Sequence, residues 1–367
     1  FYMIRSDVLL AIFCFGVSFI FTVVAMPGVF SACRKWNLYD LPGGRKVHQS
    51  AIPRLGGVLF LPALLLAVAV GLIANDGQSD LVVHPSSLLL ACGALLIYLV
   101  GLVDDTVGVT ARHKFAFQII ASAVLPFCNL YINDLYGFFG VYEIPMWLGY
   151  FLTVFWVLLV VNAVNLIDGI DGLASGLVIL SLIVFSVLFS QIHAWLYVVA
   201  SCALMGTVAA FFLFNLWGRV DKGTKIFMGD SGSLILGYAM AYLSIKYAMN
   251  NDMVLPDTRS GNIVWPFTIL LIPVFDLVRV AFGRILKGRS FFHADKTHLH
   301  HKLMNLMTMR QTLCAILGLF VVFCLINTFL LSIALNATFI LLLDILLFTA
   351  FIEAINLIIR HKKKHKL

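Results

Sequence analysis

The sequence has 367 residues, of which 61% are hydrophobic and 12% are charged, with a mean hydropathy of +1.00 and a formal net charge of +7. Soluble domains carry about twice that charged fraction, so a water-soluble globular fold is excluded. We therefore expect an all-α, polytopic integral membrane protein. We interpret the positive charge as a membrane-orientation signal, so no nucleic-acid partner is expected.

Eleven apolar runs approach the length of about 20 residues that a helix needs to cross a bilayer. They lie at 8–30, 55–74, 86–103, 115–132, 147–164, 173–190, 195–216, 231–249, 263–283, 312–334 and 337–359. No linker or internal repeat separates them. We expect residues 1–367 to form a single membrane domain of about eleven transmembrane helices.

Lysine and arginine gather in alternate loops. They follow the first, third, seventh and ninth apolar runs and end the chain at Arg360-His-Lys-Lys-Lys-His-Lys366, whereas the opposite loops carry mostly acids. Because cytoplasmic loops have an excess of Lys and Arg, this pattern predicts an outside N-terminus and a cytoplasmic C-terminus. Every polar motif described below then lies on the cytoplasmic side.

The first basic loop, residues 41–57, combines positive charge with two pairs of glycines. Lys46 and His48 lie between these pairs. The positive-inside rule accounts for the charges but not for the glycines. We therefore interpret the loop as a contact for a lipid phosphate at headgroup depth.

Asp104 and Asp105 close the third apolar run. Adjacent residues on a helix point about 100° apart, so at most one of the two carboxylates can address the same point as a distant motif. The other would form local hydrogen bonds or orient its neighbour. A solvated helix end is the alternative interpretation of this pair.

The segment from Asn162 to Leu173 follows the fifth apolar run. Asn165, Asp168 and Asp171 recur every third residue, so in a helical turn they would share one face. Charge is costly at membrane depth, and convergent oxygen ligands suit a hard divalent cation or its phosphate partner. The alternative is a glycine-rich helix break that is solvated at the membrane surface.

The eighth run opens with Gly229-Asp230-Ser231-Gly232. The N-terminal amides of a helix can bind a phosphate, and Asp230 can bind a cation. Helix capping by Asp or Ser is the alternative. Capping alone would not require glycine on both sides, so we favour a binding role.

The longest cytoplasmic loop carries three histidines within four residues, His298, His300 and His301, with Arg289 upstream. These donors are suited to a pyrophosphate or to sugar hydroxyls. Zinc is the rival ligand, but it would need a fourth protein ligand, and no cysteine or carboxylate pattern nearby supplies one.

In this order the motifs resemble the polyprenyl-phosphate N-acetylhexosamine-1-phosphate transferases. The matching residues are Arg45-Lys46-x-His48, Pro53-x-x-Gly56-Gly57, Asp104-Asp105, Asn162-Ala-x-Asn165-x-x-Asp168-Gly-x-Asp171-Gly-Leu173, Phe227-Met-Gly-Asp230-x-Gly-Ser233 and His298-x-His300-His301. The resemblance runs from about residue 34 to 302. His-x-His-His is similar to the branch of bacterial enzymes that move N-acetylglucosamine-1-phosphate onto undecaprenyl phosphate. The relative that transfers phospho-MurNAc-pentapeptide has three consecutive histidines, a run that Leu299 interrupts here.

The resemblance implies a Mg²⁺-dependent enzyme, with Mn²⁺ as a substitute. It would transfer N-acetylglucosamine-1-phosphate from UDP-GlcNAc to undecaprenyl phosphate and release UMP. This is the first membrane step of an O-antigen, common-antigen, capsule or teichoic-acid type of polysaccharide. The implied setting is the bacterial inner (cytoplasmic) membrane, with the active site facing the cytoplasm. The sequence leaves open whether the chain forms a homodimer.

The resemblance also implies roles for individual residues. Asp230 is the expected metal ligand, assisted by Asp104 or Asp168. The expected catalytic carboxylates are Asp104, Asp105, Asp168 and Asp171. Phe227 would stack on uracil. The other expected substrate contacts are Asn165 and Asn215 for the nucleoside, Arg289, His298, His300 and His301 for the diphosphate and sugar, and Lys46 and His48 for the lipid phosphate or the nucleotide.

Three alternatives stay open. The same reaction could use UDP-GalNAc or UDP-MurNAc-pentapeptide, because the loop from Arg289 to Lys296 departs from the pattern of the branch. A cation-coupled transporter would place its acids at the membrane midplane, whereas here the acids cluster at the cytoplasmic ends of the predicted spans, with Asp276, Asp344 and Glu353 as the clear exceptions inside them. A non-catalytic lipid-binding scaffold would not need carboxylates in several separate motifs.

Overall fold

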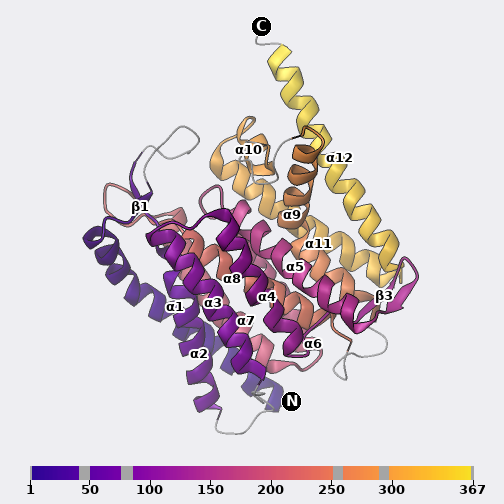
Figure 1. Ribbon diagram of the computed structural model, residues 1–367, viewed down its shortest axis with the longest axis horizontal. Helices are drawn as coiled ribbons and strands as arrows, with labels where there is room; N and C mark the ends of the chain where they lie inside the picture. Colours follow the sequence, from indigo (N-terminus) through magenta and orange to yellow (C-terminus); the bar gives the residue numbers. More distant parts are fainter. Residues whose placement is uncertain (1, 41–49, 76–85, 251–258, 289–296, 365–367) are drawn as a thin grey trace. The chain divides into compact units, whose positions relative to one another are not determined.

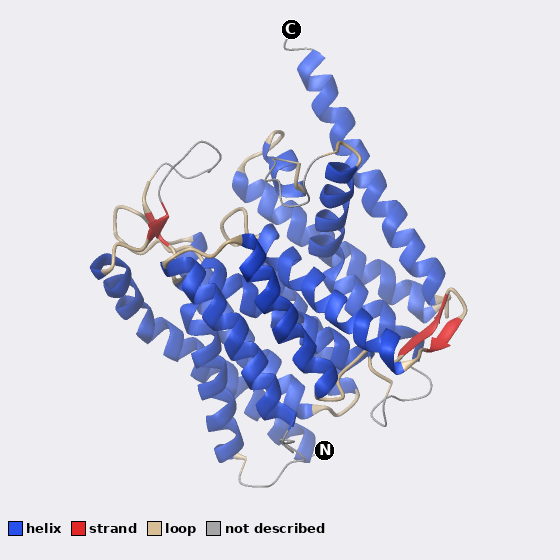
Figure 2. Ribbon diagram, in the orientation of Figure 1, coloured by secondary structure: helices blue, strands red, loops and turns tan. Residues whose placement is uncertain are grey.

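The computed structural model describes residues 2–40, 50–75, 86–250, 259–288 and 297–364 (Figures 1 and 2). These ranges are mostly α-helical. The helices are α1 (Tyr2–Lys35), α2 (Phe60–Ala74), α3 (Ser86–Thr106), α4 (Ala111–Phe127), α5 (Met146–Ile167), α6 (Leu173–Gln191), α7 (Trp195–Leu216), α8 (Gly229–Ala248), α9 (Arg259–Ile285), α10 (Leu299–Met304), α11 (Met309–Ser332) and α12 (Ala337–Lys364), with a short 3-10 helix, η1, at Gly56–Leu59.

Nine helices within the described ranges are long and apolar enough to cross a membrane. The protein is therefore a multi-pass membrane protein, as predicted, and nine of the eleven expected spans correspond to such helices in the described ranges. The two runs that drop out, 115–132 and 231–249, are helical but shorter or more polar. The first forms α4, which has 17 residues, and the second forms α8, which opens with Gly-Asp-Ser-Gly-Ser and carries Lys246 in its last turn.

Two small antiparallel hairpins correct the prediction of an all-α fold. One pairs β1 (Tyr39–Asp40) with β2 (Ile52–Pro53), and the other pairs β3 (Asp134–Phe138) with β4 (Val141–Glu143). Both are too short for an alternating pattern of apolar and polar residues to show in the sequence.

The chain forms two compact units. Unit 1 contains residues 1–131 and 150–246, and unit 2 contains residues 132–149 and 247–367. In unit 1, α7 packs against α1, α2 and α6, and α3 packs against α4. In unit 2, α9 packs against α11 and α12, and α10 contacts both α11 and α12.

The close packing of α1 and α7 in unit 1 depends on small residues. A side chain on Gly206 of α7 would collide with Ser18 and with the carbonyl of Phe15 on α1. One turn further along α1, the hydroxyl of Thr22 donates a hydrogen bond of 2.8 Å to the hydroxyl of Thr207. Small and hydroxylated residues at such a contact are how helices associate where no water drives their apolar faces together.

The glycine pair at 56–57 has a packing role. The segment 53–57 pairs through its backbone with the segment 227–228, because the amides of Gly56 and Gly57 donate hydrogen bonds of 2.8 Å to the carbonyls of Phe227 and Met228. A Cβ on Gly57 would collide with the backbone of Gly232 in α8. The glycines that the positive-inside rule left unexplained therefore let the end of the first basic loop hold the start of α8.

Candidate active site

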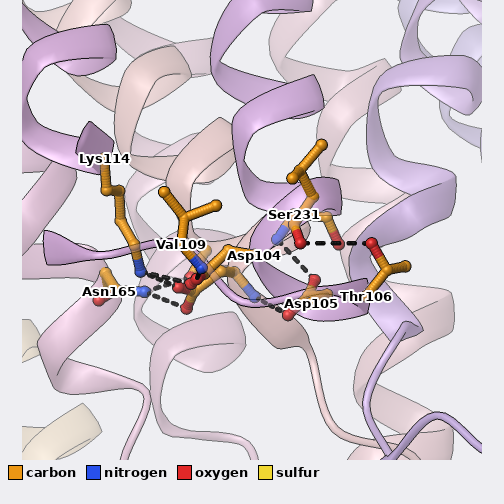
Figure 3. A network of polar contacts seen from close by, with 10 residues as sticks. Asp104, Asp105, Thr106, Val109, Lys114, Asn165 and Ser231 are labelled. Carbon is orange, nitrogen blue, oxygen red and sulfur yellow. Dashed lines mark hydrogen bonds and ion pairs between the residues drawn. The ribbon is translucent and has the colours of Figure 1, made fainter.

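Asp105 fixes the start of α8. Its two carboxylate oxygens accept hydrogen bonds from the backbone amides of Asp230 (2.7 Å) and Ser231 (2.8 Å), as Figure 3 shows for Ser231. These amides have no partner inside the helix, and a carboxylate suits their partial positive charge. Asp105 is buried, with 5% of its surface exposed. Asp105 therefore caps the N-terminus of α8 through its side chain. Its direct participation in catalysis stays a prediction.

Gly229 makes this arrangement sterically feasible. Its φ is +74°, in the left-handed region that favours glycine, and a Cβ there would collide with the Asp105 carboxylate and the Arg54 carbonyl. Because Asp105 occupies the amides of Asp230 and Ser231, these amides cannot also bind a phosphate. The expectation of a phosphate bound by the backbone at this helix start is therefore not supported for these two amides.

Asp104 turns to a different partner from Asp105, as expected for adjacent residues on a helix. One of its oxygens accepts a hydrogen bond of 2.6 Å from the amide of Val109, and the other lies 2.6 Å from the ammonium of Lys114. The turn between α3 and α4 brings Lys114 back over the end of α3. The ammonium of Lys114 also forms an ion pair with Asp230.

We call Asp104, Lys114 and Asp230 the acid–lysine cluster. The exposed fractions of the three side chains are 17%, 20% and 25%, so the cluster is shielded but open to a ligand. Burial disfavours the charge of Lys114, but the carboxylates of Asp230 and Asp104 outweigh it and raise the pKa of the ammonium. Two carboxylates thus share one fixed cation.

Asn165 orients Asp230 from α5. Its amide nitrogen donates hydrogen bonds of 2.8 Å to a carboxylate oxygen of Asp230 and to the hydroxyl of Ser233. Asn165 was predicted to bind the nucleoside, and in the structure its amide belongs to the acidic site itself.

The expectation that Asn165, Asp168 and Asp171 share one helical face is wrong. Helix α5 ends at Ile167, and Asp168 and Asp171 lie in the turn that leads to α6. The turn closes with Gly172, the N-cap residue of α6, at a φ of +77°, in the left-handed region that favours glycine. Burial and the neighbouring carboxylates of Asp171, Asp230 and Asp105 raise the pKa of Asp168 to about 7.

Asp171 and Asn215 hold the turn after α5 to the segment before α8. Asp171 lies 2.6 Å from the ammonium of Lys225, which also donates to the carbonyl of Asn215. The side chain of Asn215 accepts a hydrogen bond of 2.7 Å from the amide of Gly172 and donates one of 2.9 Å to the carbonyl of Ile226. Asn215 is 4% exposed, so its amide acts as a clamp between these segments, and its nucleoside contact stays a prediction.

The acids offer oxygen ligands, which Mg²⁺ prefers. Among the residues that the structure describes, no three His, Cys, Asp or Glu side chains are grouped closely enough to hold a metal ion by themselves. Mg²⁺ is usually bound through one or two carboxylates, with substrate phosphates and water completing its shell. Asp104 and Asp230 fit this mode of binding, in which phosphate and water complete the shell. The described residues do not fit a site in which protein ligands alone hold the ion.

The histidine motif belongs to unit 2. His298 pairs through Nδ1 with Asp276 at 2.8 Å, and its ring stacks on that of His300 with 5.9 Å between centroids. Burial and the neighbouring His301 lower the pKa of His300 to about 3, so its ring is neutral at physiological pH. His300 can therefore offer hydrogen bonds to a substrate but no charge. Its contact with a diphosphate, like that of His298 and His301, stays a prediction.

Three predicted substrate contacts, Lys46, His48 and Arg289, lie outside the described residues. Phe227 is half-buried beside the start of α8, and its amide donates a hydrogen bond of 2.8 Å to the carbonyl of Pro53. Stacking of its ring on uracil stays a prediction.

A sequence profile of the family described as Glycosyl transferase family 4 matches residues 87–248. Three curated bacterial proteins are similar over most of the chain. A "Probable undecaprenyl-phosphate N-acetylglucosaminyl 1-phosphate transferase" of Bacillus subtilis is 30% identical over 308 residues, which cover 82% of this chain and 79% of that protein. The "Undecaprenyl-phosphate alpha-N-acetylglucosaminyl 1-phosphate transferase" of Yersinia pestis is 30% identical over 327 residues, with 85% and 83% covered. A protein of the same name from Escherichia coli O157:H7 is 30% identical over 294 residues, with 78% and 74% covered.

The chain belongs to glycosyl transferase family 4. The resemblance inferred from the motifs is thereby confirmed. The profile covers Asp104 at the end of α3, Lys114 on α4 and Asp230 at the start of α8, and so the whole acid–lysine cluster of this family 4 transferase.

Sequence reasoning missed three residues of these sites. Lys114 was interpreted only as an orientation charge, although a lysine just after an acidic pair, across one short turn, was a usable signal. Lys225 was treated in the same way. Asp276 stood out as an acid inside an apolar run, but no sequence pattern linked it to His298, which is 22 residues away in the chain.

Proposed function

We propose that this family 4 transferase moves N-acetylglucosamine-1-phosphate from UDP-GlcNAc to undecaprenyl phosphate, giving undecaprenyl-diphospho-GlcNAc and UMP. The observation that carries the proposal is the acid–lysine cluster at the start of α8, where two carboxylates and one ammonium meet without full burial. Three relatives named for this reaction support it.

The reaction requires one bond to form and one to break. An oxygen of the lipid phosphate attacks the β-phosphorus of the UDP-sugar, and the bond from that phosphorus to the bridging oxygen breaks. UMP leaves with the electron pair. The lipid phosphate is already ionised at neutral pH, so a general base is not essential. What the protein must supply is positioning and a fixed positive environment for the diphosphate.

The residues of unit 1 are suited to this task. Lys114 supplies a positive charge that needs no reorganisation, and Asn165 and Asp105 hold Asp230 from two sides. Asp104 and Asp230 would hold Mg²⁺, or Mn²⁺ in its place. The cation would neutralise the charge of the diphosphate. Asp168, with a pKa near 7, is the carboxyl group best placed to change protonation state during turnover.

We place the protein in a bacterial cytoplasmic membrane with the acid–lysine cluster facing the cytoplasm. Support comes from the basic loops, because Arg219, Lys222 and Lys225 lie in the segment before α8. In a Lys222→Cys variant, an impermeant maleimide should label the new thiol in inside-out vesicles but not in right-side-out vesicles. The unsubstituted chain gives the background from native cysteines. The opposite labelling pattern would reverse the proposed orientation.

The sugar is assigned as GlcNAc because Leu299 separates His298 from His300-His301. A compact polar pocket discriminates strongly when a wrong substrate leaves its buried groups unpaired. UDP-GalNAc differs only in the orientation of one hydroxyl, so it is the competing donor. UDP-MurNAc-pentapeptide is the other alternative.

One assay tests these assignments. Purified protein is incubated with undecaprenyl phosphate and each of the three UDP-sugars, with Mg²⁺, with Mn²⁺ or with EDTA, and UMP is measured. We expect UMP release to be fastest with UDP-GlcNAc and to require both the lipid and the cation. Faster turnover of the pentapeptide donor would overturn the sugar assignment. A burst of UMP stoichiometric with the enzyme in the absence of lipid would indicate a covalent enzyme intermediate, and no release with any donor would favour a transporter.

A further inference from the structure

Asp276 occupies an unusual position in unit 2. It lies within α9, inside a helix long and apolar enough to span the membrane, and only 1% of its surface is exposed. A buried carboxylate in such a place is costly unless every oxygen has a partner. The hydrogen-bond partners of Asp276 therefore indicate its role.

Within the described residues, the partners of Asp276 lie on its own helix or in the segment that carries the histidine motif. One oxygen lies 2.8 Å from His298 Nδ1. The other accepts hydrogen bonds from the amide of Leu299 (2.9 Å) and from Arg279 Nη2 (2.6 Å). Arg279 Nη2 also donates to the carbonyl of Thr297 at 2.7 Å. The residues before and after His298 are thus both held by the Asp276–Arg279 pair.

The chemistry of the pair determines which ring nitrogen is left for a ligand. An ionised carboxylate can only accept, so Nδ1 of His298 must carry the proton that it shares with Asp276. Nε2 is then the one remaining polar atom of that ring. A carboxylate bonded to one nitrogen of a histidine fixes both the tautomer and the orientation of the ring.

The backbone contacts add a second function to the same carboxylate. Helix α10 has only six residues, Leu299–Met304, so its own hydrogen bonds cannot hold it in place. The bond from the Leu299 amide to Asp276 ties the first turn of α10 to α9. His298 is consequently oriented through its ring and through its backbone by a single side chain.

We propose that Asp276 is a positioning residue that presents Nε2 of His298 to an anionic oxygen of the nucleotide-sugar diphosphate. The proposal rests on the proposed function, because it takes the substrate from there. Arg279 supports Asp276 and holds the carbonyl of Thr297. The competing explanation is that the Asp276–His298 pair only ties α9 to α10 and has no effect on the reaction.

A double-mutant cycle separates the two explanations. Asp276→Asn keeps the shape but removes the charge, and His298→Gln removes the ring that Asp276 orients. Each single variant should lower kcat/KM for UDP-GlcNAc by about tenfold to hundredfold, the range typical of residues that orient a functional histidine. If Asp276 acts through His298, the double variant should be no slower than the slower single variant. Losses that multiply, or an Asp276→Asn variant as active as the native protein, would overturn the proposal.

Asp344→Asn is the matched control. Asp344 is also a fully buried carboxylate on a membrane-spanning helix of unit 2, and its described partner is Asn327 instead of a histidine. This variant should keep native kcat/KM. Thermal unfolding midpoints of all variants show whether a loss of activity comes from unfolding.

A spectroscopic measurement keeps the proposal testable if Asp276→Asn does not fold or if no donor is turned over. In protein labelled with [15N]histidine, the His298 signals are identified by their loss in His298→Gln. We expect a protonated Nδ1 in the native protein. A His298 whose Nδ1 carries no proton would overturn the proposal whatever the enzyme assay shows. A protonated Nδ1 in a protein that turns over no UDP-sugar would instead count against the proposed function alone.

Discussion

Two polar clusters, one in each unit, surround their acidic side chains with opposite kinds of partner. In the acid–lysine cluster of unit 1, Asp104 and Asp230 both pair with the ammonium of Lys114. In unit 2, Asp344 of α12 accepts a hydrogen bond of 2.8 Å from Asn327 of α11, which also donates one of 2.7 Å to Thr268 of α9. We call these last three residues the amide cluster.

Exposure separates the two clusters further. The acid–lysine side chains are 17–25% exposed, whereas Asp344 and Asn327 are completely buried. No ion pair joins Asp344 to a lysine or arginine of the described ranges, and one oxygen of Asp344 and one of Asn327 have no hydrogen-bond partner there. An acid inside a membrane helix is therefore not by itself a catalytic group. Charged side chains that are paired but accessible can interact with a substrate or its cation. A buried acid that is hydrogen-bonded to an amide side chain instead holds two helices together.

The largest effect is expected from Asp230→Asn. The substitution keeps the shape of the side chain but removes the charge that would hold the cation and that Lys114 now neutralises. Turnover of UDP-GlcNAc should fall by about a hundredfold to a thousandfold, the range seen when one preorganised electrostatic group is removed. The unfolding midpoint should change little, because Asn165 can still donate to the new amide oxygen.

Asp221→Asn provides the control for Asp230→Asn. Among the described residues, the ion-pair partner of Asp221 is the exposed Arg219, so the loss of this charge should leave turnover native. If Asp230→Asn kept more than about a tenth of native activity, less than about 1.4 kcal/mol of transition-state stabilisation would have been lost. The metal role of Asp230 would then be untenable.

The next largest effect concerns Lys114→Gln. Without the ammonium, Asp104 and Asp230 face each other with no counter-charge, and turnover should fall by about tenfold to hundredfold. The half-saturating concentration of Mg²⁺ should also fall, because a cation no longer competes with the lysine for the two carboxylates. An unchanged Mg²⁺ requirement would show that Lys114 and the cation do not share the carboxylates. Lys222→Gln, at an exposed position, should behave as the native protein.

Only part of the fold and of the candidate site could be predicted from the sequence alone. Membrane class could be predicted from the long apolar runs, and Asp104 and Asp230 could be singled out as candidate site residues, because charge beside such runs is rare and its cost is known. Sequence spacing could not predict that α5 ends before Asp168, since a period of three residues is compatible with a helix and with a turn. Nor could it predict that Asp105 caps α8, a contact between residues 126 positions apart. Pairings of this kind depend on the packing of helices, which local sequence patterns do not encode.

A smaller effect is expected from Asp105→Asn. The new amide can accept only one of the two hydrogen bonds from Asp230 and Ser231, and its NH₂ group faces the other donor. One buried amide left without a partner costs about 1–3 kcal/mol, which should lower the thermal unfolding midpoint. Turnover should fall by about tenfold, because Asp230 loses its fixed position, a loss of about 1.4 kcal/mol. A native midpoint together with a loss as large as that of Asp230→Asn would instead give Asp105 a direct catalytic role.

The smallest effect is expected in the amide cluster, and there it should concern stability alone. Asp344→Leu leaves the amide of Asn327 short of a partner in a buried, apolar place, and hydrogen bonds between membrane helices contribute about 0.6–1.7 kcal/mol. The unfolding midpoint should fall accordingly, while turnover stays native. Replacing both partners, as in Asn327→Leu with Asp344→Leu, removes the unsatisfied groups together and should restore most of the midpoint. Thermal unfolding and UMP release measured on the same preparations decide the matter. If turnover fell in the double variant although its unfolding midpoint was restored, the amide cluster would take part in the reaction. The distinction between a catalytic cluster in unit 1 and a purely structural one in unit 2 would then be wrong.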